Sequence, residues 1–162
     1  MAKKTALVTG GASGIGAAVC RELALQGVRV AVCDINKADG EPLAKKIGGE
    51  FIECNVTKLS SVQDAVDTCK ESMGIPDYVH LNAGIMTVPT GEPFLSIEDV
   101  TEAQYQKIVG VNLSGVYHGM RTLLPLMRDK GGAVTITAST AGLSVVPVDP
   151  LYTATKYALV GF

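Results

Sequence analysis

Residues 5–16 read TALVTGGASGIG, and this stretch decides the fold. An apolar run of strand length, 5–9, leads into glycines and then into a helix-forming segment, which predicts the order strand, turn, helix. The first turn of a helix has unpaired N–H groups and a partial positive charge, and together these bind a phosphate. Gly10, Gly14 and Gly16 let the phosphate approach because they have no side chains. Their spacing, G-x-x-x-G-x-G, differs from the commoner G-x-G-x-x-G, and a tight connection without a ligand is the alternative interpretation.

Strand-like and helix-like segments alternate along the rest of the chain. We predict strands at 5–9, 28–33, 50–54, 78–81 and 133–137, and helices at 14–26, 37–47, 59–73, 102–128 and from near 150 onwards. The strand segments are rich in Val and Ile without a two-residue alternation, which is typical of a parallel sheet covered on both faces. The predicted fold class is therefore α/β, a doubly wound parallel sheet in a single domain over 1–162.

Two features of this pattern carry further expectations. Residues 84–100 form a long irregular stretch after the fourth strand, and such a loop inside a compact domain is more often functional than accidental. Pro125 lies inside the long helical segment. We expect it to kink that helix or to end it early, because proline has no N–H group to donate.

The composition excludes several classes of function. The 162 residues carry 14 basic and 16 acidic side chains, and they contain no basic block of the kind that binds nucleic acid or an anionic membrane. No apolar run approaches the roughly 18 residues that span a bilayer. The cysteines form no C-x-x-C pair and the histidines have no partners at ligand spacing, so we expect reduced thiols, a cytoplasmic location and no metal. These residues are Cys20, Cys33, Cys54, Cys69, His80 and His118.

Asp34 gives the glycine turn a more specific meaning. It ends the second predicted strand, and in a doubly wound sheet this position faces the ribose next to the adenine. A carboxylate accepts hydrogen bonds from both ribose hydroxyls and repels a 2′-phosphate, so NAD is favoured over NADP. A solvated acid at a strand end is the alternative interpretation of Asp34 alone.

Four polar residues in the second half of the chain suggest acid–base chemistry. Tyr152 and Lys156 are four positions apart and share one helix face. An ammonium stabilises a nearby phenolate, so the two can act as an acid–base couple, although the spacing alone is common by chance. Ser139 follows the fifth predicted strand, where its hydroxyl can hydrogen-bond a carbonyl oxygen. Asn112 lies in the middle of a predicted helix, and its amide can hold a water bound to Lys156. The alternative interpretation is that Asn112 is an ordinary helical residue without a role in the chemistry.

Together these motifs resemble those of the short-chain dehydrogenase/reductase (SDR) family. The resembling motifs are T-G-x-x-x-G-I-G at 9–16, N-A-G at 82–84, Asn112, Ser139 and Y-x-x-x-K at 152–156, and they extend over nearly the whole chain. The resemblance implies a Rossmann fold and an NAD-dependent oxidoreductase that interconverts a secondary alcohol and a ketone by hydride transfer. A catalytically incomplete nucleotide-binding module and a related epimerase or dehydratase are the alternatives.

The resemblance also implies a role for each matching residue. Tyr152 would give or take the proton, and Ser139 would orient the substrate oxygen. Lys156 would bind the nicotinamide ribose, and Asn112 would complete a water-linked proton relay. The implied cofactor-binding residues are Gly10, Ser13, Gly14, Ile15, Gly16, Asp34, Ile35 beside the adenine, Asn55, Val56, Asn82, Ala83, Gly84, Tyr152 and Lys156.

The chain departs from the family pattern in two places that bear on the site. The family usually has an Asp before the Val that ends the third strand, where it contacts the adenine amine, and this chain has Asn55 before Val56. We expect the Asn55 amide oxygen to accept the same hydrogen bond from the adenine amine, so that cofactor binding is weakened only modestly. The N-N-A-G motif of the family begins here with Leu81, which keeps the core of the motif.

The resemblance further implies a longer protein. Family members continue beyond position 162 with further strands and a substrate-binding loop, so we expect the domain to be incomplete at its C-terminus. The full-length protein is expected to be a homodimer or homotetramer. Apolar residues within 141–148 suggest the wall of a pocket for a hydrophobic alcohol or ketone, with plain core packing as the alternative.

Overall fold

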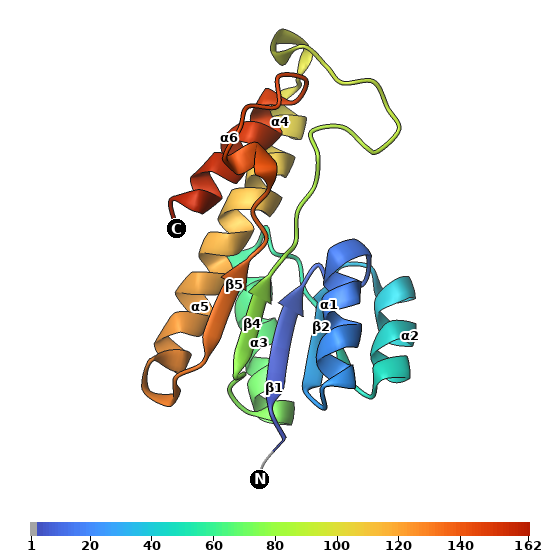
Figure 1. Ribbon diagram of the computed structural model, residues 1–162, viewed down its shortest axis with the longest axis vertical. Helices are drawn as coiled ribbons and strands as arrows, with labels where there is room; N and C mark the ends of the chain where they lie inside the picture. The colour runs from blue at the N-terminus through green and yellow to red at the C-terminus, as the bar shows by residue number, and fades with distance from the viewer. Residues whose placement is uncertain (1–2) are drawn as a thin grey trace.

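A parallel sheet of five strands forms the centre of the molecule (Figure 1). The computed structural model describes residues 3–162. The strands are β1 (Thr5–Thr9), β2 (Arg29–Asp34), β3 (Glu50–Glu53), β4 (Tyr78–Leu81) and β5 (Ala133–Ile136). Their order is β3-β2-β1-β4-β5, and each neighbouring pair is parallel. The predicted fold class and the five predicted strands are confirmed, and the glycine turn follows the central strand.

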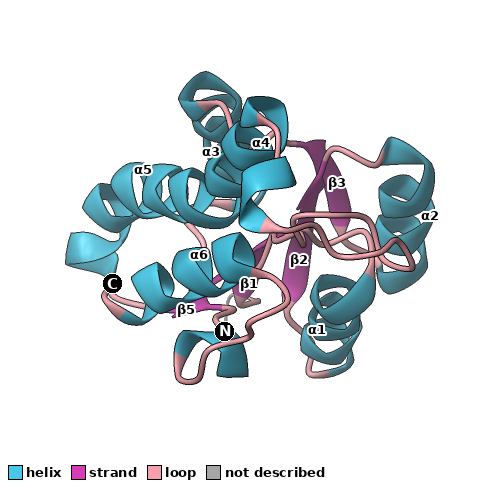
Figure 2. Cartoon of the chain, turned by 90° about the horizontal axis from the view of Figure 1, so that it is seen from above, coloured by secondary structure: helices cyan, strands magenta, loops and turns pink. Residues whose placement is uncertain are grey.

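Helices cover the sheet on both faces (Figures 1 and 2). One face carries α1 (Gly14–Leu25) and α2 (Lys37–Ile47), and the other carries α3 (Leu59–Met73) and α5 (Gly115–Lys130). The remaining helices, α4 (Glu102–Val109) and α6 (Pro150–Val160), lie beyond the carboxyl ends of the strands. Within residues 3–162, no helix has the length and hydropathy needed to cross a membrane.

Successive residues of the inner strands pack into two different apolar clusters. In β1, Ala6 and Val8 pack with residues of α1 and α2, whereas Leu7 packs with residues of α3 and α5. Because both faces of β1 are buried, its sequence does not alternate between apolar and polar residues.

The segment predicted as one helix over 102–128 is divided into three parts. Between α4 and α5 lies η2 (Gly110–Ser114), a π-helical turn that contains the fully buried Asn112. The expectation that Pro125 ends the helix early is wrong, since α5 continues to Lys130. Proline removes one backbone bond, but Leu123 and Met127 on either side of it stay buried in the apolar cluster between α5 and the sheet. Burial of these side chains outweighs the lost bond.

Candidate active site

A cleft with a volume of about 850 Å³ opens at the carboxyl ends of the strands. Most of the residues predicted for the cofactor line it: Gly10, Ser13, Gly14, Ile15, Asp34, Ile35, Asn55, Val56, Asn82, Ala83, Gly84, Tyr152 and Lys156. The first part of the loop after β4 also lines it, through residues 85–90. Three predicted residues, Gly16, Asn112 and Ser139, are not part of the lining.

The glycine turn between β1 and α1 needs residues without side chains for two reasons. Gly10 and Gly14 have φ values of +63° and +52°, a conformation that residues with a Cβ atom rarely adopt. A Cβ atom on Gly10 would lie 2.8 Å from Ala83 Cα, whereas one on Gly14 would meet nothing within 4 Å. Gly10 therefore allows two backbone segments to approach each other, and Gly14 leaves the cleft open beside the helix.

Gly16 has a packing role in this turn. A Cβ atom at this position would lie 2.1 Å from the carbonyl oxygen of Gly10 and 2.6 Å from the Asn82 amide nitrogen. Gly16 is buried, so it allows the first turn of α1 to pack directly on the strand end instead of contacting the cleft.

The first turn of α1 presents its backbone to the cleft. Ser13 is the N-cap residue, but its side chain makes no capping hydrogen bond, and no acidic residue lies in the first turn. The N–H groups of this turn therefore keep their hydrogen-bonding capacity and the positive end of the helix dipole is not neutralised. This arrangement suits a phosphate group.

Asp34 connects the glycine turn to the end of β2. Its two carboxylate oxygens accept hydrogen bonds from Ala12 N (3.0 Å) and Asn36 N (2.9 Å). Each oxygen keeps a second lone pair, and Asp34 lines the cleft, so the carboxylate can still accept hydrogen bonds from a ligand.

Asn82 fixes the strand end on the other side of the turn. Its amide nitrogen lies 3.2 Å from the carbonyl oxygens of both Thr9 and Gly10, and its backbone N–H donates to Thr9 Oγ1 (3.0 Å). The Asn82 Oδ1 atom accepts a hydrogen bond from Thr137 Oγ1 (3.0 Å). The side chain thus joins the ends of β1, β4 and β5 at the floor of the cleft.

Asn55 does not offer its amide oxygen to the cleft, contrary to the expectation from the sequence. Its Oδ1 atom accepts hydrogen bonds from both Thr57 N (3.0 Å) and Thr57 Oγ1 (2.7 Å). These bonds close a turn between β3 and α3 and use both lone pairs of the oxygen.

Tyr152 and Lys156 lie together on α6. The Lys156 ammonium is 5.6 Å from the centroid of the Tyr152 ring. It donates a hydrogen bond to the Thr137 carbonyl oxygen (2.8 Å), just after β5, and Lys156 is only 3% exposed. Burial lowers the pKa of Lys156 below its ordinary value of 10.5. The cleft therefore holds a phenol and a fixed amine side by side.

The other two predicted catalytic residues bond to neighbouring segments. Asn112 donates through its amide nitrogen to Ile85 O (2.9 Å) and Thr155 Oγ1 (3.1 Å), and its Oδ1 atom accepts from Ile85 N (2.8 Å). Both amide hydrogens of Asn112 are thus used. The proton relay through a water bound to Lys156 stays a prediction, and Asn112 could contribute to it only through its Oδ1 atom. Ser139 begins a short turn, η3 (Thr140–Gly142), and its Oγ atom accepts a hydrogen bond from Ala141 N (3.1 Å).

Sequence reasoning missed Asp149, which positions Tyr152. This carboxylate is 1% exposed and accepts hydrogen bonds from Tyr152 N (3.0 Å), Thr87 N (3.1 Å) and Thr87 Oγ1 (2.5 Å). It therefore caps α6 and attaches the loop after β4 to the helix that carries Tyr152. An Asp followed by Pro150 is a typical helix-start pattern and could have revealed the cap.

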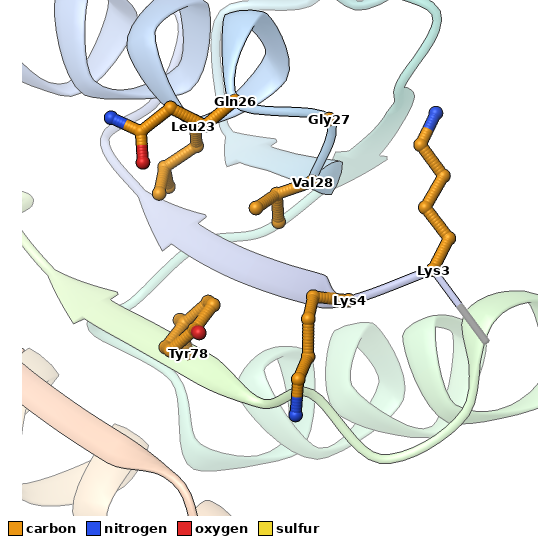
Figure 3. A pocket seen from close by; sticks show the side chains of 7 residues that line it. All are labelled: Lys3, Lys4, Leu23, Gln26, Gly27, Val28 and Tyr78. Carbon is orange, nitrogen blue, oxygen red and sulfur yellow. The ribbon is translucent and has the colours of Figure 1, made fainter. Parts of the chain in front are cut away.

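Other chemically reactive groups do not form a second site in the described chain. Burial raises the pKa of Cys54, the thiol that lines the cleft, to about 11, so this thiol is neutral at neutral pH. Among residues 3–162, no three His, Cys, Asp or Glu side chains lie close enough together to hold a metal ion. A cavity of about 470 Å³ lies at the opposite end of the sheet (Figure 3). Its lining consists of Lys3, Lys4, Leu23, Gln26, Gly27, Val28 and Tyr78. This lining contains no acid or histidine that could act as an acid–base group. In open parallel sheets, ligands bind at the carboxyl ends of the strands, which is the opposite end from this cavity.

The sequence profile of the family described as short chain dehydrogenase matches residues 4–162. The chain belongs to this family. A mitochondrial borneol dehydrogenase from Lavandula x intermedia is 33% identical over 162 residues, and a 3-alpha-(or 20-beta)-hydroxysteroid dehydrogenase from Mycobacterium tuberculosis is 34% identical over 161 residues. Each alignment covers 98% of this chain and 60% of the relative, so the chain spans about 60% of the length of these relatives.

A solved structure agrees with the fold and with the predicted cofactor. The 3-ketoacyl-(acyl-carrier-protein) reductase from Brucella melitensis, complexed with NADH, superposes with a TM-score of 0.90 at 31% sequence identity. The match covers 99% of this chain and 66% of that chain. The resemblance inferred from the motifs is thereby confirmed at the level of the family.

Proposed function

We propose that this chain carries the NAD-binding and acid–base parts of an oxidoreductase that interconverts a secondary alcohol and a ketone. The observation that supports it most directly is that Tyr152 and Lys156 line the same cleft as the glycine turn and Asp34. A hydrophobic substrate is proposed because the two relatives are named for borneol and for hydroxysteroids, which are apolar alcohols.

The residues of the cleft fit NAD. The free amides of the first turn of α1 would hold the pyrophosphate, and Asp34 would accept the hydroxyls of the adenosine ribose. Lys156 would donate to the ribose of the nicotinamide half. When bound, the nicotinamide ring supplies a hydride acceptor or donor, which the protein side chains lack.

Tyr152 handles the proton in this proposal. Its phenolic oxygen takes the hydroxyl proton of the alcohol during oxidation and returns it to the ketone oxygen during reduction. The Lys156 ammonium, held by Thr137 O, lies 5.6 Å from the centroid of the Tyr152 ring, beside the phenol that transfers the proton. Ser139 would hydrogen-bond the same substrate oxygen and orient it.

The test compares two tyrosines of α6. Tyr152→Phe removes the phenolic oxygen in the cleft, and Tyr157→Phe is the matched control because Tyr157 is exposed on the same helix and does not line the cleft. With a panel of apolar secondary alcohols, we expect Tyr152→Phe to lower NADH production by about a hundredfold or more, the usual size of an acid–base contribution. NADH binding should stay intact, and Tyr157→Phe should be normal.

Each outcome distinguishes the alternatives. Unchanged turnover in Tyr152→Phe refutes the role of the phenol. NADH binding without turnover by the unsubstituted chain favours the nucleotide-binding module, and turnover without net NADH production favours an epimerase or dehydratase. A cytoplasmic location and a homodimer or homotetramer for a longer protein remain predictions from the sequence.

A further inference from the structure

The Lys156 ammonium is attached to a backbone atom at the edge of the sheet. Its hydrogen-bond partner in the described chain is the carbonyl oxygen of Thr137, the residue that directly follows β5. In the described sheet β5 pairs with β4 alone, and the bond from Thr137 N to Leu81 O (3.0 Å) extends this pairing by one residue. The position of Lys156 therefore depends on what holds Thr137 against β4.

A polar side chain of β4 makes a second connection to this end of β5. His80 lies opposite Thr135 in the parallel pairing, and its ring is half-buried. The Nδ1 atom of His80 is 2.8 Å from Thr135 Oγ1, and its Nε2 atom is 3.2 Å from Thr137 Oγ1. The ring thus bridges two residues on one face of β5, and the second of them holds Lys156.

The direction of these hydrogen bonds follows from the amide of Asn82. Its NH₂ group faces two backbone carbonyl oxygens, which can only accept, so its Oδ1 atom faces Thr137. The single hydroxyl hydrogen of Thr137 is therefore donated to Asn82 Oδ1, and His80 Nε2 has to donate to Thr137 Oγ1. Burial lowers the pKa of His80 below its ordinary value of 6.5, so the ring is neutral at pH 7. Its Nδ1 atom then accepts from the Thr135 hydroxyl.

We infer that His80 is a positioning residue for Lys156, because its ring holds Thr137 against β4 and the Thr137 carbonyl oxygen in turn holds the ammonium in the cleft. In the proposed function, on which this inference rests, the remaining ammonium hydrogens of Lys156 reach the ribose of the nicotinamide half. Loss of the ring leaves the Thr137 hydroxyl with Asn82 as its partner and gives the end of β5 more freedom. Binding of the nicotinamide half should weaken, whereas binding at the glycine turn should not.

Two ligands that reach different parts of the cleft test this role. NADH extends from the glycine turn to Lys156, whereas ADP lacks the nicotinamide half. Binding of NADH is measured by its fluorescence at pH 7, and binding of ADP by displacement of NADH. We expect His80→Leu, which removes both ring nitrogens, to raise the dissociation constant of NADH about fivefold, the size of one hydrogen bond, and to leave that of ADP unchanged.

Two further variants separate the hydrogen bonds from the shape of the side chain. His80→Gln keeps an N–H donor at the end of the side chain, so it should restore most of the NADH affinity. Thr135→Val removes the hydroxyl that orients the ring through Nδ1, and the fold should tolerate it because Thr135 is exposed. We expect it to raise the dissociation constant of NADH about twofold and to leave that of ADP unchanged.

His118→Leu is the matched control at the opposite side of the cleft. His118 Nδ1 donates to the carbonyl oxygen of Val56 (2.9 Å), and Val56 lines the cleft beyond the end of β3. Because NADH and ADP share the adenosine, this variant should leave the ratio of their dissociation constants unchanged. Circular dichroism establishes that each variant is folded. Exchange of the Thr137 amide hydrogen, followed by NMR, should be faster in His80→Leu than in the unsubstituted chain.

Several results would overturn the inference and leave the proposed function standing. These are unchanged NADH binding in His80→Leu, an equal loss of NADH and ADP binding, unchanged exchange of the Thr137 amide, and a His80→Gln variant as weak as His80→Leu. If His80→Leu does not fold, the comparison of NADH with ADP in Thr135→Val decides in the same way. Failure of the folded unsubstituted chain to bind either ligand overturns the proposed function together with the inference.

Discussion

The strands β1 and β5 both end at the cleft, but they are built differently. Each residue of β1 is buried, and β1 pairs with β2 and β4. In β5, Ala133 and Thr135 are exposed, Val134 and Ile136 are half-buried, and the strand pairs with β4 alone in the described sheet. The phosphate-binding end of the cleft therefore rests on a fully buried strand, whereas the acid–base end rests on a half-exposed strand and on α6, which is held by hydrogen bonds and by the buried Leu159. The difference predicts which substitutions each end tolerates.

The largest effect is expected from a methyl group in the turn after β1. Gly16→Ala places a Cβ atom 2.1 Å from the Gly10 carbonyl oxygen, and the backbone has to move. We expect a loss of about 3 kcal/mol in the free energy of unfolding, measured by urea denaturation, and loss of NADH binding. Gly110→Ala is the control, because its Cβ atom would lie 3.5 Å from the Thr57 side chain in ordinary contact. Equal stability of the two variants would contradict the close packing of this turn.

A matched pair of valines compares the two strands directly. Val8 in β1 is 0% exposed, and Val134 in β5 is half-buried. We expect Val8→Ala to lower the free energy of unfolding by about 2.5 kcal/mol and Val134→Ala by about 1 kcal/mol, because the second leaves a smaller cavity. Urea denaturation of both variants measures the difference. Equal losses would mean that β5 is as well packed as β1.

A smaller, pH-dependent effect is expected at the other end of the strands, where Asp77 joins β1 to α5. Burial alone would raise the pKa of Asp77, but hydrogen bonds from Thr5 N, Lys4 and Lys130 outweigh it and lower this pKa from 3.8 to about 2. The carboxylate therefore stabilises the fold above pH 4, and this contribution is lost as the pH falls through 2.

Asp77→Asn removes that charge and tests the linkage. We expect it to lower the free energy of unfolding at pH 7 by up to about 2 kcal/mol, and by less in high salt because the Lys4 ammonium is exposed. The difference between the variant and the unsubstituted chain, followed by denaturation across pH, should shrink between pH 4 and pH 2. A difference independent of pH would show that the ion pairs do not carry the stabilisation.

The parts of the molecule that depend on local sequence were predictable. The glycine turn, the strand that ends at Asp34 and the helical spacing of Tyr152 and Lys156 are short-range patterns, and the structure brings them to one cleft. The apolar runs indicated the parallel sheet because each inner strand is covered on both faces.

The parts that depend on contacts distant in sequence were not predictable. The π-helical turn follows from Asn112 turning inward to bond Ile85 and Thr155, which no periodicity reveals. The continuation of α5 past Pro125 depends on tertiary packing. One local feature was also missed: the Asn55 amide oxygen bonds Thr57, two residues away, whereas the resemblance in residue type had directed this oxygen to the adenine amine.

A fluorescence titration of this chain with NADH, and in parallel with NADPH, tests most directly the claim that the glycine turn and Asp34 form a site for NAD. Saturable binding that prefers NADH is the predicted result, because the Asp34 carboxylate accepts ribose hydroxyls and repels a 2′-phosphate. Binding that prefers NADPH, or no binding of either by the folded chain, would contradict the account.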